Sequence, residues 1–338
     1  MILEKQFIFI IGSPRSGTSW LRMMIAAHPM VCTTVELTTF SKYTAPWIKA
    51  WNNERDNIEQ GRWHQGLPFL WGEDEFYVFL REFIKRVYER VVALNPQATH
   101  ILDKHPGYSM FVEDIHWLLP GARFIHIIRD GRDVAGSMVA ARENIGFGTS
   151  TIPESASAWK DHVLAARKSM QYNDQYLELK YEDLLNESNK ILKSVYNFCE
   201  LSVSAQDIHE IVNQHRFERM KARRQSPDKR VQMIPGHFRK GKAGSWREDI
   251  NPIERFLFDE IAGDLLIELG YAKDGWWVES RIQKLTLPLL AAISSGTPRE
   301  RVVRSTKVLL GPRLSGHIKA VRSRIRNEMP RTNKGTAR

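Results

Sequence analysis

The fold of this chain is decided by the stretch Phe7-Ile-Phe-Ile-Ile-Gly-Ser-Pro-Arg-Ser-Gly-Thr-Ser19. Its opening run, Phe7–Ile11, is wholly apolar and predicts a short strand that is buried on both faces, as in a parallel sheet. Residues 18–27 then predict a helix, because a His-Pro pair follows and ends it. Gly12 and Gly17 lie between strand and helix with the G-x-x-x-x-G spacing of a phosphate-binding loop. This order of elements predicts a parallel α/β fold.

The same order of strand, turn and helix returns further along the chain. Residues Arg123–Ile128 predict a second buried strand, and Asp133–Arg142 predict the helix that follows it. Short apolar segments at His100–Leu102 and Tyr176–Leu179 predict two more strands, and Asn186–Phe198 predicts a further helix. The alternation predicts a three-layer, P-loop-like α/β fold in which helices flank a parallel sheet.

A helical insertion is predicted between the strands. Apolar residues recur from Phe76 to Val91, Phe79 among them, at the spacing of one helix face. Four tryptophans precede this segment: Trp47, Trp51, Trp63 and Trp71. They belong either to the core or to a cleft that receives a second substrate, and the sequence leaves both interpretations open.

The composition excludes several classes of protein. The chain has 338 residues, of which 42% are hydrophobic and 26% are charged. These values are ordinary for a globular protein and exclude a collagen, a polytopic membrane protein and wholesale disorder. We find no secretory signal pattern, and two cysteines, Cys32 and Cys199, make no disulfide framework. We therefore expect a reduced, cytoplasmic setting.

The positive charge is concentrated at the C-terminal end. The formal net charge is +10, but Arg281–Arg338 holds 14 Lys or Arg against 2 Asp or Glu, so the first 280 residues carry a net charge of −2. The body is therefore not a basic nucleic-acid binder. We expect an α/β domain over residues 1–280 and a basic, helical or partly disordered extension over residues 281–338. The extension either contacts an anionic membrane surface peripherally or is solvated.

The first loop has the chemistry of a phosphate site. Backbone N–H groups at the start of a helix lack internal partners and attract anions. Ser16, Thr18 and Ser19 add hydroxyl donors, and Arg15 adds a cation. A Walker loop has lysine where this chain has Thr18, so the loop is expected to bind phosphate without working as a metal-dependent nucleoside triphosphatase.

Two later segments carry further cationic groups. Arg129 follows a predicted strand, at the edge where open α/β sheets bind ligands, and Ser137 lies in the helix that follows. Together they are able to hold another phosphate, although Arg129 is equally suited to capping a carbonyl or pairing with a nearby aspartate. The third segment is Arg239-Lys-Gly241, a basic glycine loop of the kind that forms anion nests.

In this order, the three segments resemble the sulfotransferase superfamily, which uses 3′-phosphoadenosine 5′-phosphosulfate (PAPS). Residues 13–21 look like that family's 5′-phosphosulfate loop, Arg129 and Ser137 match its 3′-phosphate pair, and the 239–241 segment looks like its RKG element. Tyr181 resembles a tyrosine that cytosolic members place near the adenine. The resemblance implies that PAPS is bound by Arg15, Ser16, Gly17, Thr18, Ser19, Trp20, Arg129, Ser137, Tyr181, Arg239, Lys240 and Gly241.

The resemblance also implies the catalytic groups. Glu36 and Lys104 look like the base and the assisting lysine of the tyrosine-sulfating branch, whereas the cytosolic branch uses a histidine, for which His105 is the candidate. Arg15 joins Lys104 in stabilising charge on the leaving group. The implied reaction is in-line transfer of the sulfuryl group to a hydroxyl or amine, with Glu36 preferred over His105 as base and with no metal.

Two other functions remain open. The chain is alternatively a P-loop kinase, or a non-catalytic binding protein with a sulfotransferase-like fold. The acceptor is a carbohydrate, a glycolipid, a peptide tyrosine or a small alcohol; neither its identity nor the oligomeric state can be read from the sequence.

Overall fold

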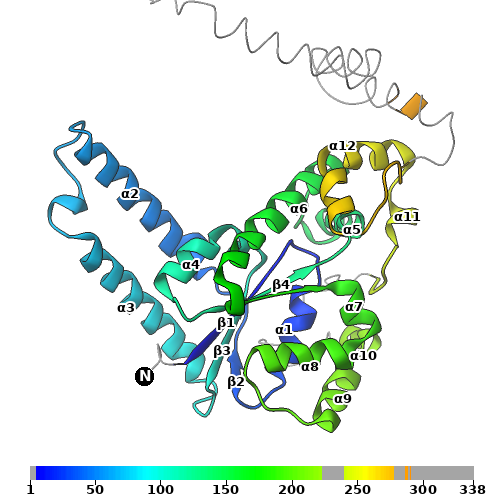
Figure 1. The fold of residues 1–338 in the computed structure, drawn as a ribbon, viewed down its shortest axis with the longest axis horizontal. Coiled ribbons are helices and arrows are strands. Elements are labelled where there is room, and N and C mark those ends of the chain that lie inside the picture. Colours follow the sequence, from blue (N-terminus) through cyan, green and yellow to red (C-terminus); the bar gives the residue numbers. More distant parts are fainter. Residues whose placement is uncertain (1–4, 223–239, 278–285, 288–289, 291–338) are drawn as a thin grey trace, which may run out of the picture. The chain divides into compact units, whose positions relative to one another are not determined.

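The computed structural model describes residues 5–222, 240–277, 286–287 and 290 (Figure 1). Within these residues the chain forms two compact units, which divide between Asp249 and Ile250. The first unit contains β1 (Gln6–Ile11), α1 (Thr18–Ala26), β2 (Val31–Thr33), η2 (Thr39–Thr44), α2 (Ala45–Glu59), η3 (Leu67–Phe69), α3 (Glu73–Val92), β3 (His100–Lys104), η4 (Pro106–Phe111), α4 (Val112–Leu118), β4 (Arg123–Ile128), α5 (Gly131–Ile145), α6 (Ile152–Arg167), η5 (Lys168–Gln175), β5 (Tyr176–Lys180), α7 (Tyr181–Asn186), α8 (Ser188–Phe198), α9 (Ala205–Gln214), α10 (Phe217–Ala222) and α11 (Trp246–Asp249).

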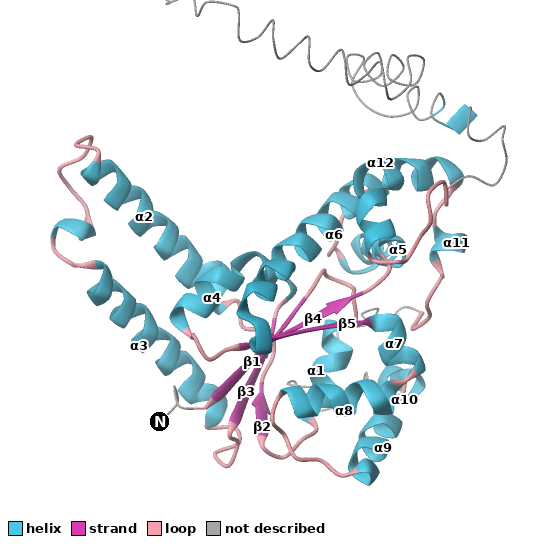
Figure 2. Cartoon of the chain, in the orientation of Figure 1, coloured by secondary structure: helices cyan, strands magenta, loops and turns pink. Residues whose placement is uncertain are grey.

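The sheet has five parallel strands in the order β2-β3-β1-β4-β5, with helices around it (Figure 2). All four predicted strands are confirmed, and β2 is an additional short strand at one edge. The register pairs Ile10 with Lys104 and Ile11 with His126. The carboxyl ends of β1, β3 and β4 therefore lie side by side, which brings the segments that follow them together.

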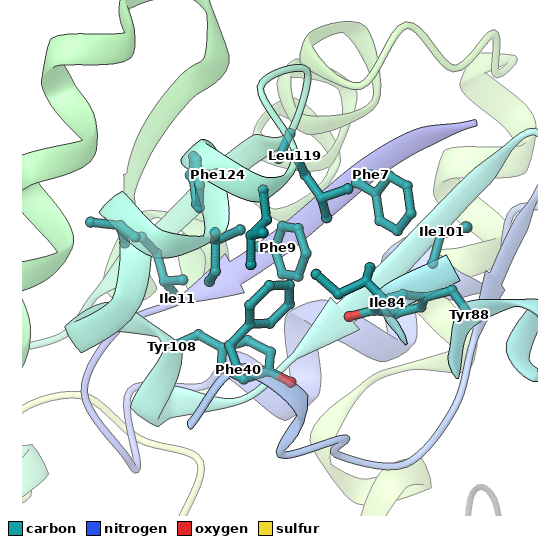
Figure 3. Close-up of a cluster of buried hydrophobic side chains, with 14 of the residues drawn as sticks. Phe7, Phe9, Ile11, Phe40, Ile84, Tyr88, Ile101, Tyr108, Leu119 and Phe124 are labelled. Atoms are coloured by element: carbon teal, nitrogen blue, oxygen red, sulfur yellow. The ribbon is translucent and has the colours of Figure 1, made fainter. Parts of the chain in front are cut away.

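Side chains of β1 alternate between two hydrophobic clusters, one on each face of the sheet. Phe9 is fully buried, and its ring contacts those of Phe40, Tyr108 and Phe124 (Figure 3). Ile10 belongs to the other cluster, with side chains from α1 and α8. Because both faces are covered, the run is apolar without a break, as the sequence predicted.

The predicted insertion is a pair of helices, α2 and α3, joined by a loop that contains η3. Phe76 and Leu80 are buried, and the ring of Trp51 stacks on Phe76 with centroids 4.3 Å apart. Phe79, which the spacing placed on the same face, is instead 45% exposed. Its ring contacts two tryptophans at the surface of the hairpin, so the buried face of α3 is narrower than the apolar pattern.

The second unit contains α12 (Pro252–Glu268). Asn251 caps this helix, because its Oδ1 accepts hydrogen bonds from the backbone N–H groups of Ile253 and Glu254. Among the described residues, no helix combines the length and the apolar composition that crossing a bilayer requires. Cys32 and Cys199 are both buried free thiols.

Several predicted features lie outside the described residues. They are Arg239 and nearly all of the basic extension over residues 281–338. The predicted division into residues 1–280 and 281–338 stays a prediction.

Candidate active site

The loop between β1 and α1 is bent by residues with positive φ. Gly12, Arg15 and Gly17 have φ values of 144°, 70° and 95°. A Cβ on Gly17 would lie 2.6 Å from Cδ2 of Tyr181, so glycine is required where this ring meets the loop. Left-handed backbone is strained at Arg15, and such strain is concentrated at functional sites.

Two buried polar atoms around this loop have no hydrogen-bond partner within the described part of the chain. They are Oγ of Ser16, in the loop itself, and Nε of Arg129, at the end of β4. Burying an unpaired donor costs about 1–3 kcal/mol. No side chain caps the start of α1, whose first N–H groups also lack helical partners. These donors suit an anion held between the loop and β4.

Arg129 connects the first loop with the segment that begins at residue 240. Its Nη1 donates to the carbonyl oxygen of Arg15 at 3.2 Å, and its Nη2 donates to that of Lys242 at 2.9 Å. The guanidinium carbon lies 4.5 Å from the ring centroid of Tyr181. Arg15 Nε donates in turn to Ser137 Oγ at 3.1 Å. The predicted phosphate ligands from the first two segments are therefore direct neighbours.

Asp133 of α5 binds residues 244–246, which follow the basic glycine loop. Its side chain is fully buried and accepts hydrogen bonds from the backbone N–H groups of Gly244 and Trp246, at 2.7 and 2.8 Å, and from Ser245 Oγ at 3.1 Å. Lys240 is nearby and forms ion pairs with two acidic residues of α11. Sequence reasoning had treated Asp133 only as a partner for Arg129, whose Nη2 lies 3.7 Å away.

Lys104, the last residue of β3, places a buried cation beside the first loop. Its side chain is 2% exposed, and Nζ donates to Ser19 Oγ at 2.9 Å and forms an ion pair with Glu36 Oε1. Glu36 is 42% exposed, and its second oxygen lies 4.0 Å from Nε2 of His105. Glu36 therefore meets Lys104 and His105, two predicted catalytic groups from a distant segment of the chain.

Burial sets the protonation of this cluster. It lowers the pKa of Lys104, and the Glu36 carboxylate opposes that shift. Burial also lowers the pKa of His105, so its imidazole is neutral at pH 7. His105 Nδ1 accepts a hydrogen bond from the backbone N–H of Gly107, which leaves the proton of the neutral ring on Nε2.

A buried carboxylate, that of Asp103, directly precedes Lys104 in β3. Asp103 Oδ2 accepts hydrogen bonds from the hydroxyls of Tyr88 and Tyr108, at 2.6 and 3.1 Å, and Oδ1 accepts one from the backbone N–H of Lys104. Burial raises the pKa of Asp103. The Tyr108 hydroxyl also accepts from Thr39 N–H, so this network holds the segment after Glu36 against β3. The sequence offered no local signal for it.

These segments surround a cavity of about 1220 Å³. One side is aromatic: Trp20 and Tyr181 have ring centroids 5.8 Å apart, and Phe217 of α10 lines the same cavity. Trp20 is fixed by its Nε1, which donates to the carbonyl of His215 at 2.7 Å. Phe217 was not singled out from the sequence, although an aromatic residue just before a basic segment is a recognisable signal.

The cavity is also lined by Phe147 and His162, which sequence reasoning missed, and His162 lies near His105. Burial lowers the pKa of His162 to about 4, and its Nδ1 is buried with no partner in the described part of the chain. The four tryptophans of the hairpin are absent from the described cavity lining. Trp51 is a core residue, and Trp47 and Trp63 are partly exposed.

The cavity brings together most of the predicted site. Ser16 is a buried residue of the loop and is absent from the described cavity lining, and Arg239 lies outside the described residues. The predicted residues that line the cavity are Arg15, Gly17, Thr18, Ser19, Trp20, Glu36, Lys104, His105, Arg129, Ser137, Tyr181, Lys240 and Gly241. In the described part of the chain, no three His, Cys, Asp or Glu side chains are placed to hold a metal ion.

Residues 7–205 match the Sulfotransferase family. A Caenorhabditis briggsae protein, named provisionally as a protein-tyrosine sulfotransferase, is 29% identical over 213 residues, which are 61% of this chain and 69% of that protein. Protein-tyrosine sulfotransferase 1 of Danio rerio is 25% identical over 203 residues, 59% of this chain. That match spans only 54% of the Danio rerio protein.

A mouse sulfotransferase crystallised with PAP has a similar fold, with a TM-score of 0.51 and 20% identity. The match covers 83% of this chain and 88% of the mouse chain. At this level of identity the similarity concerns the fold, and it agrees with the predicted parallel sheet flanked by helices.

Proposed function

Because the chain belongs to the sulfotransferase family, we propose that it transfers the sulfuryl group of PAPS to a hydroxyl or amine acceptor. The observation that carries the proposal is the position of the ion pair between the buried Lys104 and the exposed Glu36. Lys104 Nζ donates to Ser19, in the first turn of α1, so the pair adjoins the phosphate loop. One cavity thus combines an anion site, a buried cation and a carboxylate.

The nucleotide is proposed to lie across the loop and the aromatic side of the cavity. Arg15, Ser137 and Arg129 form a connected set of donors suited to its phosphate groups, and Arg129 Nε has no partner among the described residues. Trp20, Tyr181 and Phe217 supply ring faces suited to stacking on a base. PAPS supplies the sulfuryl group and the leaving phosphate.

The chain's own groups then have three tasks. Lys104 and Arg15 stabilise the negative charge that develops as the bond between sulfur and the bridging oxygen breaks. Glu36 accepts the proton of the acceptor as the new bond to sulfur forms. The walls of the cavity hold donor and acceptor in line, which removes much of the entropic barrier.

The hydrogen bonding of His105 supports Glu36 as the base. His105 Nε2 carries the proton of the neutral ring, because Nδ1 already accepts from Gly107. The nitrogen that faces Glu36 is therefore a donor in this arrangement. Glu36 keeps Oε2 outside its ion pair with Lys104, on the side where His105 lies.

The test is a transfer assay with sulfur-labelled PAPS and pooled acceptor extracts, in which mass spectrometry identifies the product. We expect a labelled product and release of PAP, which is the adenosine 3′,5′-bisphosphate that remains of PAPS after sulfuryl transfer. Glu36→Gln is expected to lower turnover by about 10²–10⁴-fold, with PAP affinity retained, and His105→Asn is expected to lower it less. Equal turnover in Glu36→Gln would remove Glu36 as the base.

Binding measurements separate the proposal from a kinase. The proposal expects PAP to bind without added Mg²⁺ and to be weakened by Arg129→Ala. Binding of ATP that requires Mg²⁺, with no affinity for PAP, would instead favour the P-loop kinase. PAP binding without transfer to any acceptor would favour the non-catalytic binding protein.

A further inference from the structure

Arg22 of α1 is a buried cation to which the proposed reaction gives no task. Its side chain is 9% exposed, and its Nη1 donates a hydrogen bond to the carbonyl oxygen of Thr34, two residues before Glu36. Its Nε is buried and has no partner in the described part of the chain. Burying a cation is costly unless opposite charges compensate it, so hydrogen bonding alone does not explain this position.

Two carboxylates supply the compensation. Burial lowers the pKa of Arg22, and the negative charges of Glu36 and Asp103 oppose this shift. The same carboxylates act on Lys104. Burial lowers the pKa of Lys104, Glu36 and Asp103 oppose the shift, and the positive charge of Arg22 adds to it. Arg22 and Lys104 therefore form one electrostatic cluster with the two carboxylates.

Helix α1 brings both cations to the same carboxylate. Ser19 and Arg22 are three residues apart and therefore lie on one face of the helix. Ser19 Oγ accepts a hydrogen bond from Lys104 Nζ at 2.9 Å, while Arg22 holds the backbone just before Glu36. Lys104 is paired directly with Glu36, whereas Arg22 acts on that carboxylate through its charge, without forming an ion pair in the described part of the chain.

The tasks of Lys104 conflict. In the structure it pairs with Glu36, but in the proposed reaction it stabilises charge on the bridging oxygen of the leaving phosphate. Separating Lys104 from Glu36 is costly, because each partner would be left with an unpaired charge in a partly buried site. A second cation lowers this cost, since Glu36 then keeps a positive charge close by.

We propose that Arg22 is a positioning residue for sulfuryl transfer: it shares Glu36 with Lys104, so that Lys104 is able to turn toward the leaving phosphate of PAPS while Glu36 stays in place. In the proposed function Lys104 assists the leaving group and Glu36 is the base, and the role of Arg22 rests on both assignments. Arg22 is absent from the described lining of the cavity, so it acts through these two side chains rather than on the substrates.

Titration of Lys104 tests the sharing without PAPS. NMR of chains with isotope-labelled lysine measures the pKa, and the Lys104→Met spectrum assigns the signal. Arg22→Met removes a positive charge that lowers the pKa of Lys104, so we expect this pKa to rise. Arg123→Met, at the start of β4, is the matched control and should leave it unchanged. Arg123 Nη1 likewise donates to a backbone carbonyl, that of Phe198, and its guanidinium pairs with Glu200.

Kinetics test the role in transfer. Arg22→Met is expected to lower turnover by about 10–100-fold with PAP affinity retained, as for other residues that orient a reactive group. Arg22→Lys keeps the charge and is expected to recover most of the turnover. In the Glu36→Gln background, Arg22→Met should change turnover less than about threefold, because the shared carboxylate is already gone.

Circular dichroism checks that each variant is folded. Arg22→Gln, which keeps a donor for the carbonyl of Thr34, replaces Arg22→Met in both measurements if that variant is unfolded.

Two results would overturn the proposal. The first is an unchanged pKa of Lys104 in Arg22→Met, since the charge of Arg22 would then not reach the ion pair. The second is an equal loss of turnover from Arg22→Met in the parent and Glu36→Gln backgrounds, which would make Arg22 only a structural tie between α1 and Thr34. If the parent chain transfers nothing from PAPS while Arg22→Met raises the pKa of Lys104, the proposed function fails and the sharing of Glu36 stands.

Discussion

The carboxyl edge of the sheet and the α2–α3 hairpin depart from ordinary burial in opposite directions. At the edge, charged groups are hidden: the side chain of Lys104 is 2% exposed and that of Asp133 is 0% exposed. On the hairpin, large apolar side chains are exposed: Leu70 is 80% exposed and Val78 is 63% exposed. Buried charges and exposed apolar patches are the two burial patterns that carry information about function.

The two regions differ in how these side chains are compensated. Lys104 has Ser19 and Glu36 as partners, and Asp133 has three donors from the segment at residues 244–246. A buried charge that loses its partner is strongly destabilising. The side chain of Leu70 is mostly in contact with water, so its replacement removes little packing. Substitutions should therefore lower the free energy of unfolding strongly at the carboxyl edge of the sheet. At the exposed surface of the hairpin they should change it little.

The largest effect is expected from Lys104→Met, which keeps the length of the side chain and removes the charge. Turnover in the PAPS transfer assay should fall about 10³-fold, because the variant lacks the cation that is proposed to stabilise the leaving group. Lys85→Met, on the partly exposed Lys85–Glu82 ion pair of α3, is the control and should keep full activity. An unchanged turnover in Lys104→Met would contradict the assigned role.

The hairpin itself allows a paired test of burial. Leu80→Ala should lower the free energy of unfolding by about 3 kcal/mol, because Leu80 is 0% exposed and its removal leaves a cavity. Val78→Ala, two residues earlier on the same helix, should change it by less than about 0.5 kcal/mol. Urea unfolding followed by fluorescence measures both. Similar losses in the two variants would mean that Val78 is covered in solution.

A smaller effect is expected at the first loop. Gly17→Ala should weaken PAP binding about tenfold, because φ is 95° and the added Cβ would collide with the ring of Tyr181. Gly121→Ala is the control, since a Cβ there meets no atom within 4 Å. Isothermal titration calorimetry compares the two. Equal affinity in both variants would show that the loop tolerates a side chain at residue 17.

A further effect, on the pH dependence of stability, concerns His162. The unfolded chain binds a proton at His162 near pH 6.5, whereas burial lowers the pKa in the folded chain to about 4. The free energy of unfolding should therefore decrease as pH falls from about 6.5 to about 4, because over this range the unfolded chain takes up a proton at His162 that the folded chain does not. His162→Gln should show a weaker pH dependence over this range, measured by urea unfolding. His64→Gln, in the exposed loop between α2 and α3, should match the parent chain.

Features that depend on neighbouring residues were predicted more accurately than contacts between residues far apart in the sequence. The first loop was identified because its strand, glycines and helix are contiguous. Asp103 and His162 were missed because nothing beside them in the sequence indicates what they contact. Phe79 was assigned to the buried face of its helix, since spacing marks an apolar face but not how much of it another element covers.

The sequence by itself determined the parallel sheet, the glycine-bounded loop between β1 and α1, and the identity of the cations and carboxylates near it. These follow from local rules, because strand runs and helix starts depend on neighbouring residues. Only the tertiary structure decided that Lys104 meets Glu36, 68 residues earlier, and that Asp103 is satisfied by two tyrosines. Such contacts depend on the register of β3 against β1, and the pKa shifts depend on burial, which is a property of the assembled fold.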